Sequence, residues 1–193
     1  MSDHKIYRTP SAYGYPLLIK QLLNTLELRH PDQEIVYADL LRYTYRDFKK
    51  RIARLANLLT SLGVREGDTV AVLDWDSHRY LECFFAIPMI GAVLHTVNIR
   101  LSPDQILYTM NHAGDDIVLI NEEFVPLMGT ILSRVETVKD WVVISESGDS
   151  PTALSPRHIA RARAILGDQG DKLTALAMHS KVYYDLLERN AID

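Results

Sequence analysis

The sequence is short of cysteine, of positive charge and of long apolar runs, and each shortage excludes a class of protein. Cys83 is the only cysteine, which excludes a secreted fold held together by disulfide bonds. A formal net charge of -4 gives no general attraction to phosphates, so nucleic acid is not an expected partner. No stretch approaches the roughly 18 to 20 apolar residues that span a bilayer. We therefore expect no transmembrane segment.

What is present is typical of a folded chain. Hydrophobic residues make up 47% and charged residues 24% of the 193 positions, far from the composition of disordered proteins. Cys83 lies inside an apolar run, which favours a small buried side chain over a nucleophile. Residues 1–16 lack the apolar centre of a signal peptide, and the cytoplasm is therefore the expected compartment.

The pattern of the first 62 residues predicts two helices and a β-hairpin. Leucines and an isoleucine at helical spacing predict a helix from Pro16 to Leu28. Glu34–Asp39 and Arg42–Tyr45 predict a β-hairpin. Thr44 then precedes a second amphipathic segment, which predicts a helix that ends at Gly63.

Strand and helix patterns alternate over residues 65–145. The predicted strands are Thr69–Asp76, Leu94–Ile99, Asp116–Asn121 and Trp141–Ser145, and the predicted helices run from Ser77 to Ile90, from Ser102, and up to Val135. Such alternation with short connections predicts right-handed βαβ units and a parallel sheet. The predicted fold class is α/β, preceded by a helix and a β-hairpin and followed by a helical tail.

A change of composition divides the chain. Residues 1–148 form the predicted α/β body, and residues 149–155, rich in Ser and Pro, form a linker. Residues 156–193 are expected to form a helical tail, with helices at Pro156–Leu166 and Asp171–Glu188.

General catalytic and metal motifs are missing from the sequence. It contains no GxGxxG, GxxxxGK[ST], HExxH, CxxC or GxSxG motif. His95, His112 and His179 are too scattered to suggest a metal site. The run Ser145–Ser150 has small residues but also two acidic ones and no lysine, which argues against phosphate binding there. We assign no catalytic residue and no metal ligand.

Several segments, taken together and in order, resemble one family. YTYRDF (Tyr43–Phe48), the helix and strand that follow it, GAV, HTVN, NIRLSP and NHAGD stand in the order and spacing found in the N-terminal region of adenylate-forming, AMP-binding enzymes. The similarity is greatest to medium- and long-chain fatty acyl-CoA synthetases (ligases), and it covers about residues 10–148.

The resemblance implies an activity that needs more than this chain. Family members join a carboxylate to the α-phosphate of ATP and transfer the acyl group to CoA, releasing AMP and pyrophosphate. The complete enzymes use ATP, Mg and CoA, with a Ser/Thr/Gly-rich phosphate loop and a lysine on a mobile C-terminal domain. Neither element is found in this sequence, so we expect no cofactor and no turnover for the chain alone.

Three polar residues at predicted strand ends are the candidate binding residues. His78, Asn98 and Arg100 lie at the ends of predicted strands, and open α/β sheets bind ligands in the crevice beyond the carboxyl ends of their strands. The alternative is that they cap helices or make hydrogen bonds between segments.

Residues 154–193 allow a second hypothesis of function. Residues 154–193 resemble a segment of tailed-phage major capsid proteins, which suggests a gene fusion, a rearranged reading frame or a deliberate chimera. The alternative to a ligase fragment is a non-enzymatic binding or assembly protein that uses the tail for association. We also expect an exposed apolar edge on the body, covered by the tail, by a homo-oligomer or by a partner chain.

Overall fold

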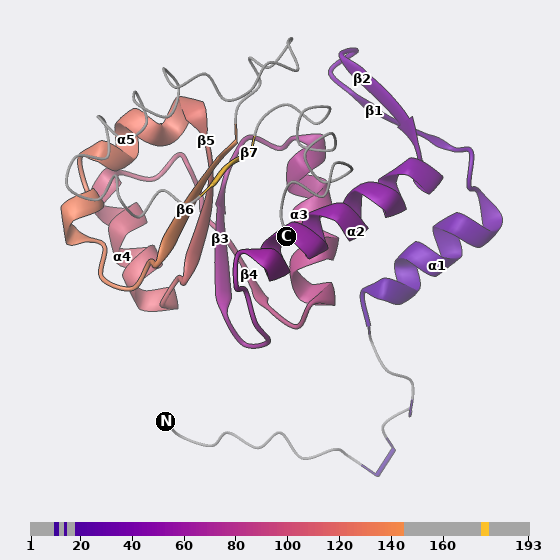
Figure 1. Cartoon of the computed structure of the whole chain (residues 1–193), viewed down its shortest axis with the longest axis horizontal. Coiled ribbons are helices and arrows are strands. Elements are labelled where there is room, and N and C mark those ends of the chain that lie inside the picture. Colours follow the sequence, from indigo (N-terminus) through magenta and orange to yellow (C-terminus); the bar gives the residue numbers. More distant parts are fainter. Residues whose placement is uncertain (1–9, 12–13, 15–17, 145–174, 178–193) are drawn as a thin grey trace.

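Helices and strands alternate around one parallel sheet in the computed structural model, which describes residues 10–11, 14, 18–144 and 175–177 (Figure 1). In chain order the elements are α1 (Lys20–Arg29), β1 (Glu34–Tyr37), β2 (Leu41–Thr44), α2 (Tyr45–Ser61), β3 (Thr69–Leu73), α3 (His78–Met89), β4 (Val93–Thr96), α4 (Pro103–Ala113), β5 (Ile117–Asn121), η1 (Glu122–Phe124), α5 (Val125–Gly129), η2 (Leu132–Arg134), β6 (Asp140–Ile144) and β7 (Ala175–Ala177).

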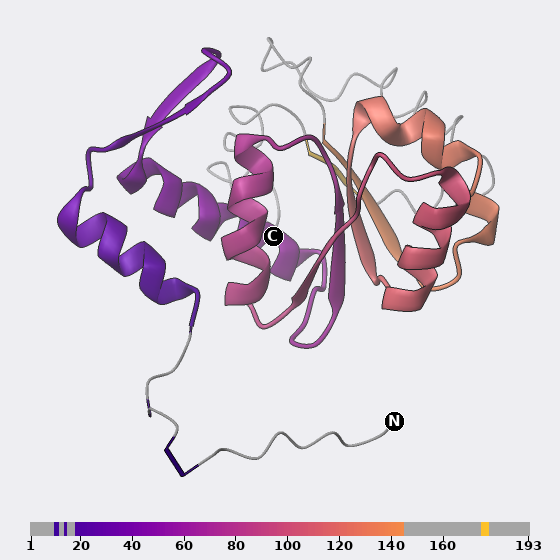
Figure 2. The ribbon, with the colours of Figure 1, turned by 180° about the vertical axis from the view of Figure 1, so that it is seen from behind.

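The central sheet has the order β4-β3-β5-β6-β7, and every neighbouring pair is parallel. Helices cover both faces, with α2 and α3 on one side and α4 and α5 on the other (Figures 1 and 2). Alternate residues of β3 point to opposite faces, so Val70 and Val72 pack in one apolar core and Ala71 and Leu73 in the other. Burial on both faces explains the nearly continuous apolar strands.

Local sequence signals fix where the helices begin. The side chain of Thr44 accepts a hydrogen bond from the backbone nitrogen of Asp47 and caps α2. Ser77 caps α3 in the same way, and Ser102 forms a capping box with Gln105 at the start of α4. Gly114, in the left-handed conformation, ends α4.

A small outer layer is formed by α1, α2 and the β1–β2 hairpin, to one side of the sheet (Figure 1). Leu23 of α1, Tyr43 of β2, and Phe48 and Ile52 of α2 share a core with Ala86 of α3. This layer is attached to the body through α3 and also through α2, whose Leu59 shares a core with Val70 and Val72 of β3.

A buried ion pair also joins α2 to α3. The Arg51 guanidinium donates to the Glu82 carboxylate at 2.5 Å, and the two side chains are only 10% and 5% exposed. Arg51 also lies over the Tyr43 ring, 5.1 Å from its centroid. Burial raises the pKa of Glu82 above its ordinary value, although the nearby Arg51 charge acts in the opposite direction.

The predicted fold class is confirmed, including the opening helix, the hairpin and the parallel sheet. The continuous helix predicted up to Val135 is wrong, because η1, α5 and η2 replace it. Pro126 and Gly129 fall in this segment, and neither suits the interior of a helix.

The tail helix predicted at Asp171–Glu188 is wrong at Ala175–Ala177, which form β7 alongside β6. A short apolar run fits either a strand or a helix, and the open edge of β6 decides between them here. The predicted linker at residues 149–155, the helix Pro156–Leu166 and the rest of the tail lie outside the described residues.

Candidate functional site

The crevice beyond the carboxyl ends of β3 and β5 is organised by the buried carboxylate of Asp74. Its Oδ1 accepts hydrogen bonds from Asn121 Nδ2 at 2.7 Å and from the Trp75 backbone nitrogen at 2.9 Å. Its Oδ2 accepts from Ser77 Oγ at 2.6 Å, and Arg79 Nε lies 3.9 Å away. Three hydrogen bonds compensate the burial of this charge.

This crevice lies at the switch point of the sheet. From β3 the chain proceeds to β4 on one side, and it then crosses to β5 on the other side. Open α/β sheets usually bind their ligands at such a point. Here a hydrogen bond between Asn121 and Asp74 joins the carboxyl ends of β5 and β3. A second bond, from Trp75 Nε1 to Glu123 Oε2 at 2.8 Å, crosses the same gap.

Among the described residues, a pocket of about 440 Å³ lies beyond β3 and β4. We call it the crevice pocket. It is lined by Asp74, Trp75, Asp76, Tyr80, Phe84, Thr96, Val97, Asn98, Ile99 and Arg100. Trp75 and Phe84 supply partly exposed aromatic surface, whereas Arg100 supplies the only cationic side chain of this lining.

The Asn98–Arg100 turn presents the positive charge of the crevice pocket. Asn98 Oδ1 accepts a hydrogen bond from the Arg100 backbone nitrogen at 3.0 Å, which holds the turn after β4. The exposed Arg100 guanidinium makes no ion pair with any other described residue. It is therefore available to an anionic ligand.

Tyr80 lies in the wall of the crevice pocket. Burial, together with the negative charges of nearby groups that include Asp76 and Asp74, raises the pKa of its hydroxyl to about 12. The hydroxyl therefore keeps its proton at neutral pH. It can donate a hydrogen bond, but it is unsuited to act as a general base.

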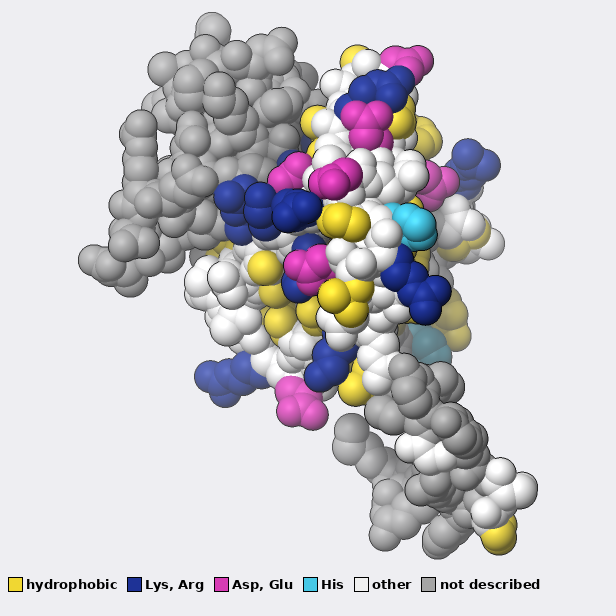
Figure 3. Space-filling model, turned by 90° about the vertical axis from the view of Figure 1, so that its right-hand side faces the viewer, with side chains coloured by type: hydrophobic (Ala, Val, Ile, Leu, Met, Phe, Trp, Pro, Cys, Tyr) yellow, Lys and Arg dark blue, Asp and Glu magenta, His cyan; other side chains and the backbone are white. Residues whose placement is uncertain are grey.

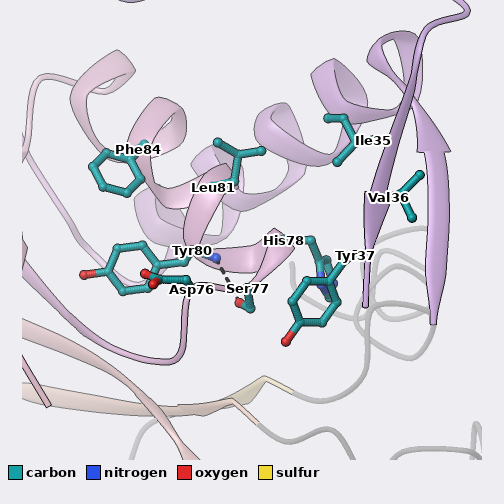
Figure 4. Close-up of a pocket in the computed structure, with 9 residues that line it drawn as sticks. All are labelled: Ile35, Val36, Tyr37, Asp76, Ser77, His78, Tyr80, Leu81 and Phe84. Atoms are coloured by element: carbon teal, nitrogen blue, oxygen red, sulfur yellow. Dashed lines mark hydrogen bonds between the residues drawn. The ribbon is translucent and has the colours of Figure 1, made fainter. Parts of the chain in front are cut away.

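A second hollow, of about 310 Å³, lies between β1 and the start of α3 (Figure 4). We call it the hairpin groove, and its lining is Ile35, Val36, Tyr37, Asp76, Ser77, His78, Tyr80, Leu81 and Phe84. Figure 4 shows the His78 and Tyr37 rings side by side, and their centroids are 5.1 Å apart. The same view shows the hydrogen bond from the Tyr80 backbone nitrogen to Ser77 Oγ, the cap of α3.

The structure separates the three predicted binding residues. Asn98 and Arg100 lie together in the crevice pocket, after β4. His78 is the first residue of α3 rather than a strand-end residue, and its buried ring lies in the hairpin groove against Tyr37 and near Tyr43. Its place is set by Ser77, since the cap makes the next residue helical.

Sequence reasoning missed Asp74, Asn121 and Tyr80. Asn121 ends one predicted strand and Asp74 lies two residues before the end of another, and this placement was the available signal. It also missed the pair formed by His95 Nδ1 and the buried Asp115 carboxylate, with distances of 2.8 and 2.9 Å. Burial raises the pKa of Asp115 despite this hydrogen bond.

No group of three or more potential metal ligands occurs among the described residues. No described helix has the length and apolar character to cross a bilayer. On the side formed by α1, the hairpin and α2, basic and acidic side chains alternate rather than form one basic patch (Figure 3). Arg42–Glu34, Arg46–Asp32 and Lys49–Glu27 are ion pairs of this side.

Similar solved structures include a CoA ligase and the N-terminal domain of a second protein. A long-chain-fatty-acid CoA ligase from Rhodopseudomonas palustris aligns with a TM-score of 0.61 and 26% identity, over 82% of this chain and 38% of that one. The N-terminal domain of FACL13 from Mycobacterium tuberculosis shares the fold, with a TM-score of 0.60 and 21% identity over 80% of this chain and 37% of that one. The fold is that of the N-terminal region of an acyl-CoA ligase.

The profile of the AMP-binding enzyme family matches residues 26–175, and the chain belongs to this family. The match extends past residue 148 into β7. The long-chain-fatty-acid–CoA ligase of Thermus thermophilus is 39% identical over 67% of this chain and 23% of its own length. The 3-methylmercaptopropionyl-CoA ligase of Ruegeria pomeroyi is 30% identical over 91% of this chain and 32% of its own. The chain thus spans at most about a third of these relatives.

Proposed function

We propose that this chain is the ligand-holding N-terminal part of a fatty acyl-CoA ligase and binds the anionic portion of a ligase ligand in its crevice pocket. The observation that carries the proposal is the Arg100 guanidinium, which is exposed in that pocket and has no ion pair with another described residue. Family members depend on ATP and CoA, and the carboxylate, ATP and CoA all present oxyanions.

The chemistry of the pocket suits an oxyanion attached to an apolar body. The Arg100 guanidinium offers planar paired donors that match a carboxylate or phosphate. The protonated Tyr80 hydroxyl supplies a neutral donor. Trp75 and Phe84 offer aromatic surface to the remainder of the ligand.

Replacing Arg100 with alanine is expected to weaken ligand binding about tenfold or more, because a hydrogen bond to a charged group contributes about 1.5–3 kcal/mol. Isothermal titration calorimetry with octanoate, ATP and CoA as separate ligands would show which source of oxyanion is bound. Arg29, exposed at the end of α1, is the matched control, and Arg29→Ala should bind as the unaltered chain does. Equal binding by both variants would overturn the role of Arg100.

We further propose that the chain alone forms no acyl-adenylate. Stabilising the charge on the transferred phosphorus requires a phosphate loop and a lysine. This sequence contains no Ser/Thr/Gly-rich run that ends near Pro-Lys-Gly. Exchange of labelled pyrophosphate into ATP in the presence of a fatty acid should stay at the level of a heat-inactivated sample. Exchange clearly above that level would contradict the proposal.

A further inference from the structure

Strand β4 forms one edge of the central sheet, and among the described strands it pairs with β3 alone. The Val97 backbone nitrogen donates to the Val72 carbonyl of β3 at 3.2 Å. Because neighbouring residues of a strand point their backbone groups to opposite sides, the N–H and C=O groups of Leu94 and Thr96 point away from the sheet. No backbone group of the described residues bonds to them. The outer side of β4 is therefore an unfilled row of donors and acceptors.

The sequence of β4 lacks the usual protection of such an edge. Proteins block open edges with lysine, proline or a bulge. The strand VLHT contains no lysine and no proline, and its residues pair with β3 in continuous register. Val93 is 53% exposed, and Phe84 and Met89 of the preceding helix α3 are each 42% exposed. Backbone groups bordered by apolar surface suit the addition of another strand.

A second copy of β4 fits this row of backbone groups. In an antiparallel pair centred on His95, Leu94 of each copy lies opposite Thr96 of the other, and each opposed pair exchanges two backbone hydrogen bonds. The two-fold axis is then perpendicular to the sheet, so both copies of α3 lie on the same face of one continuous sheet. Helices α3 and α4, which precede and follow β4, lie on opposite faces of each sheet (Figure 2).

The charges at the two ends of β4 favour a copy of this chain over an unrelated strand. Arg100 follows the carboxyl end of β4. Glu66 lies at the amino end, where a Cβ atom added to Gly91 would be 2.9 Å from its Cγ. Both charged side chains are exposed, and neither makes an ion pair with a described residue. Antiparallel pairing brings the carboxyl end of one strand to the amino end of the other, and thus brings opposite charges together twice in each dimer.

We infer that two copies of this chain form a symmetric dimer through the outer edges of their β4 strands, with Leu94 opposite Thr96 and Arg100 beside Glu66 of the second copy. This inference does not rest on the proposed ligand role of Arg100, because the backbone pairing needs no bound oxyanion. An oxyanion in the crevice pocket competes with Glu66 for the guanidinium and therefore favours the separated chains.

Sedimentation equilibrium of the full chain, without added ligand, should show a monomer–dimer equilibrium. Thr96→Pro should raise the dissociation constant of the dimer about tenfold or more, because it removes one outward N–H group from each copy and its ring blocks the approaching strand. The Thr96 N–H makes no bond within the sheet, so the melting curve by circular dichroism should show a retained fold. A chain that stays monomeric, or a dimer that Thr96→Pro leaves unchanged, would overturn the inference.

Charge reversal tests the antiparallel register. Glu66→Arg and Arg100→Glu should each raise the dissociation constant about tenfold, because like charges then meet twice in the dimer. The two changes combined restore opposite charges and should return the constant to within about threefold of that of the unaltered chain. Glu136→Arg, at an exposed position before β6, is the matched control and should leave the constant unchanged. Single reversals without effect, or no recovery in the double variant, would overturn the pairing.

Discussion

Replacing Glu82 with alanine is expected to lower the free energy of unfolding by about 3–5 kcal/mol, because it leaves the Arg51 guanidinium buried without its carboxylate. Arg51 and Glu82 are 10% and 5% exposed and join α2 to α3. Chemical denaturation followed by circular dichroism would measure the loss. Glu136 is exposed and its side chain makes no ion pair with a described residue, so Glu136→Ala should change stability by less than about 0.5 kcal/mol.

The double variant Arg51→Met, Glu82→Met separates the ion pair from the packing. Burial raises the pKa of Glu82 although Arg51 is adjacent, so the cost of burying the carboxylate exceeds the gain from the pair. The double variant should therefore be close to the unaltered chain in stability, well above Glu82→Ala. A double variant as unstable as Glu82→Ala would show that the pair itself stabilises the fold.

The same pKa shift gives a pH dependence. Because the pKa of Glu82 is higher in the folded chain than in the unfolded chain, the folded chain binds this proton more tightly. The resulting stability is fully present below the ordinary pKa of a glutamate and is lost as pH rises through the folded pKa. Relative to Glu82→Gln, the unaltered chain should thus lose stability as pH rises above about 4, the ordinary pKa of a glutamate.

Replacing Asp74 with alanine is expected to cost about 3 kcal/mol of stability, because it removes a buried acceptor of three hydrogen bonds. Asn121 Nδ2 and Ser77 Oγ would lose the partners that now lie 2.7 and 2.6 Å away. Ser77 caps α3, so the start of that helix should fray as well. Hydrogen exchange at the Tyr80 amide would report this fraying.

Asp76 provides the matched control, since it has the same charge, lies two residues away and is exposed without an ion pair to a described residue. Asp76→Ala should change stability by less than about 0.5 kcal/mol. If both aspartates had the same effect, net charge rather than the Asp74 hydrogen bonds would explain the loss.

Most of the fold could be predicted from local sequence patterns. Thr44 and Ser102 begin helices because a side-chain oxygen next to an amphipathic run meets the first free backbone amides, and the sequence shows both features. The continuous apolar run that opens at Thr69 likewise indicates a strand buried on both faces.

Pairings distant in sequence could not be predicted. β7 is a strand because its three residues lie against the edge of β6, and nothing within Ala175–Ala177 distinguishes it from a helix turn. Asp74 and Asn121 are 47 residues apart, and only the strand order brings them together. The resemblance of residues 154–193 to a capsid segment stays a prediction.

The two hollows share a wall, since Asp76, Tyr80 and Phe84 line both the crevice pocket and the hairpin groove. Any occupant of one hollow that shifts these side chains changes the free energy of occupying the other. By thermodynamic linkage the two effects are equal in size, so a crevice-pocket ligand that weakens binding in the hairpin groove tenfold is itself bound ten times more weakly when the groove is occupied. Coupling of this kind needs no larger movement than a change of side-chain rotamer at Phe84, the exposed aromatic residue of the shared wall.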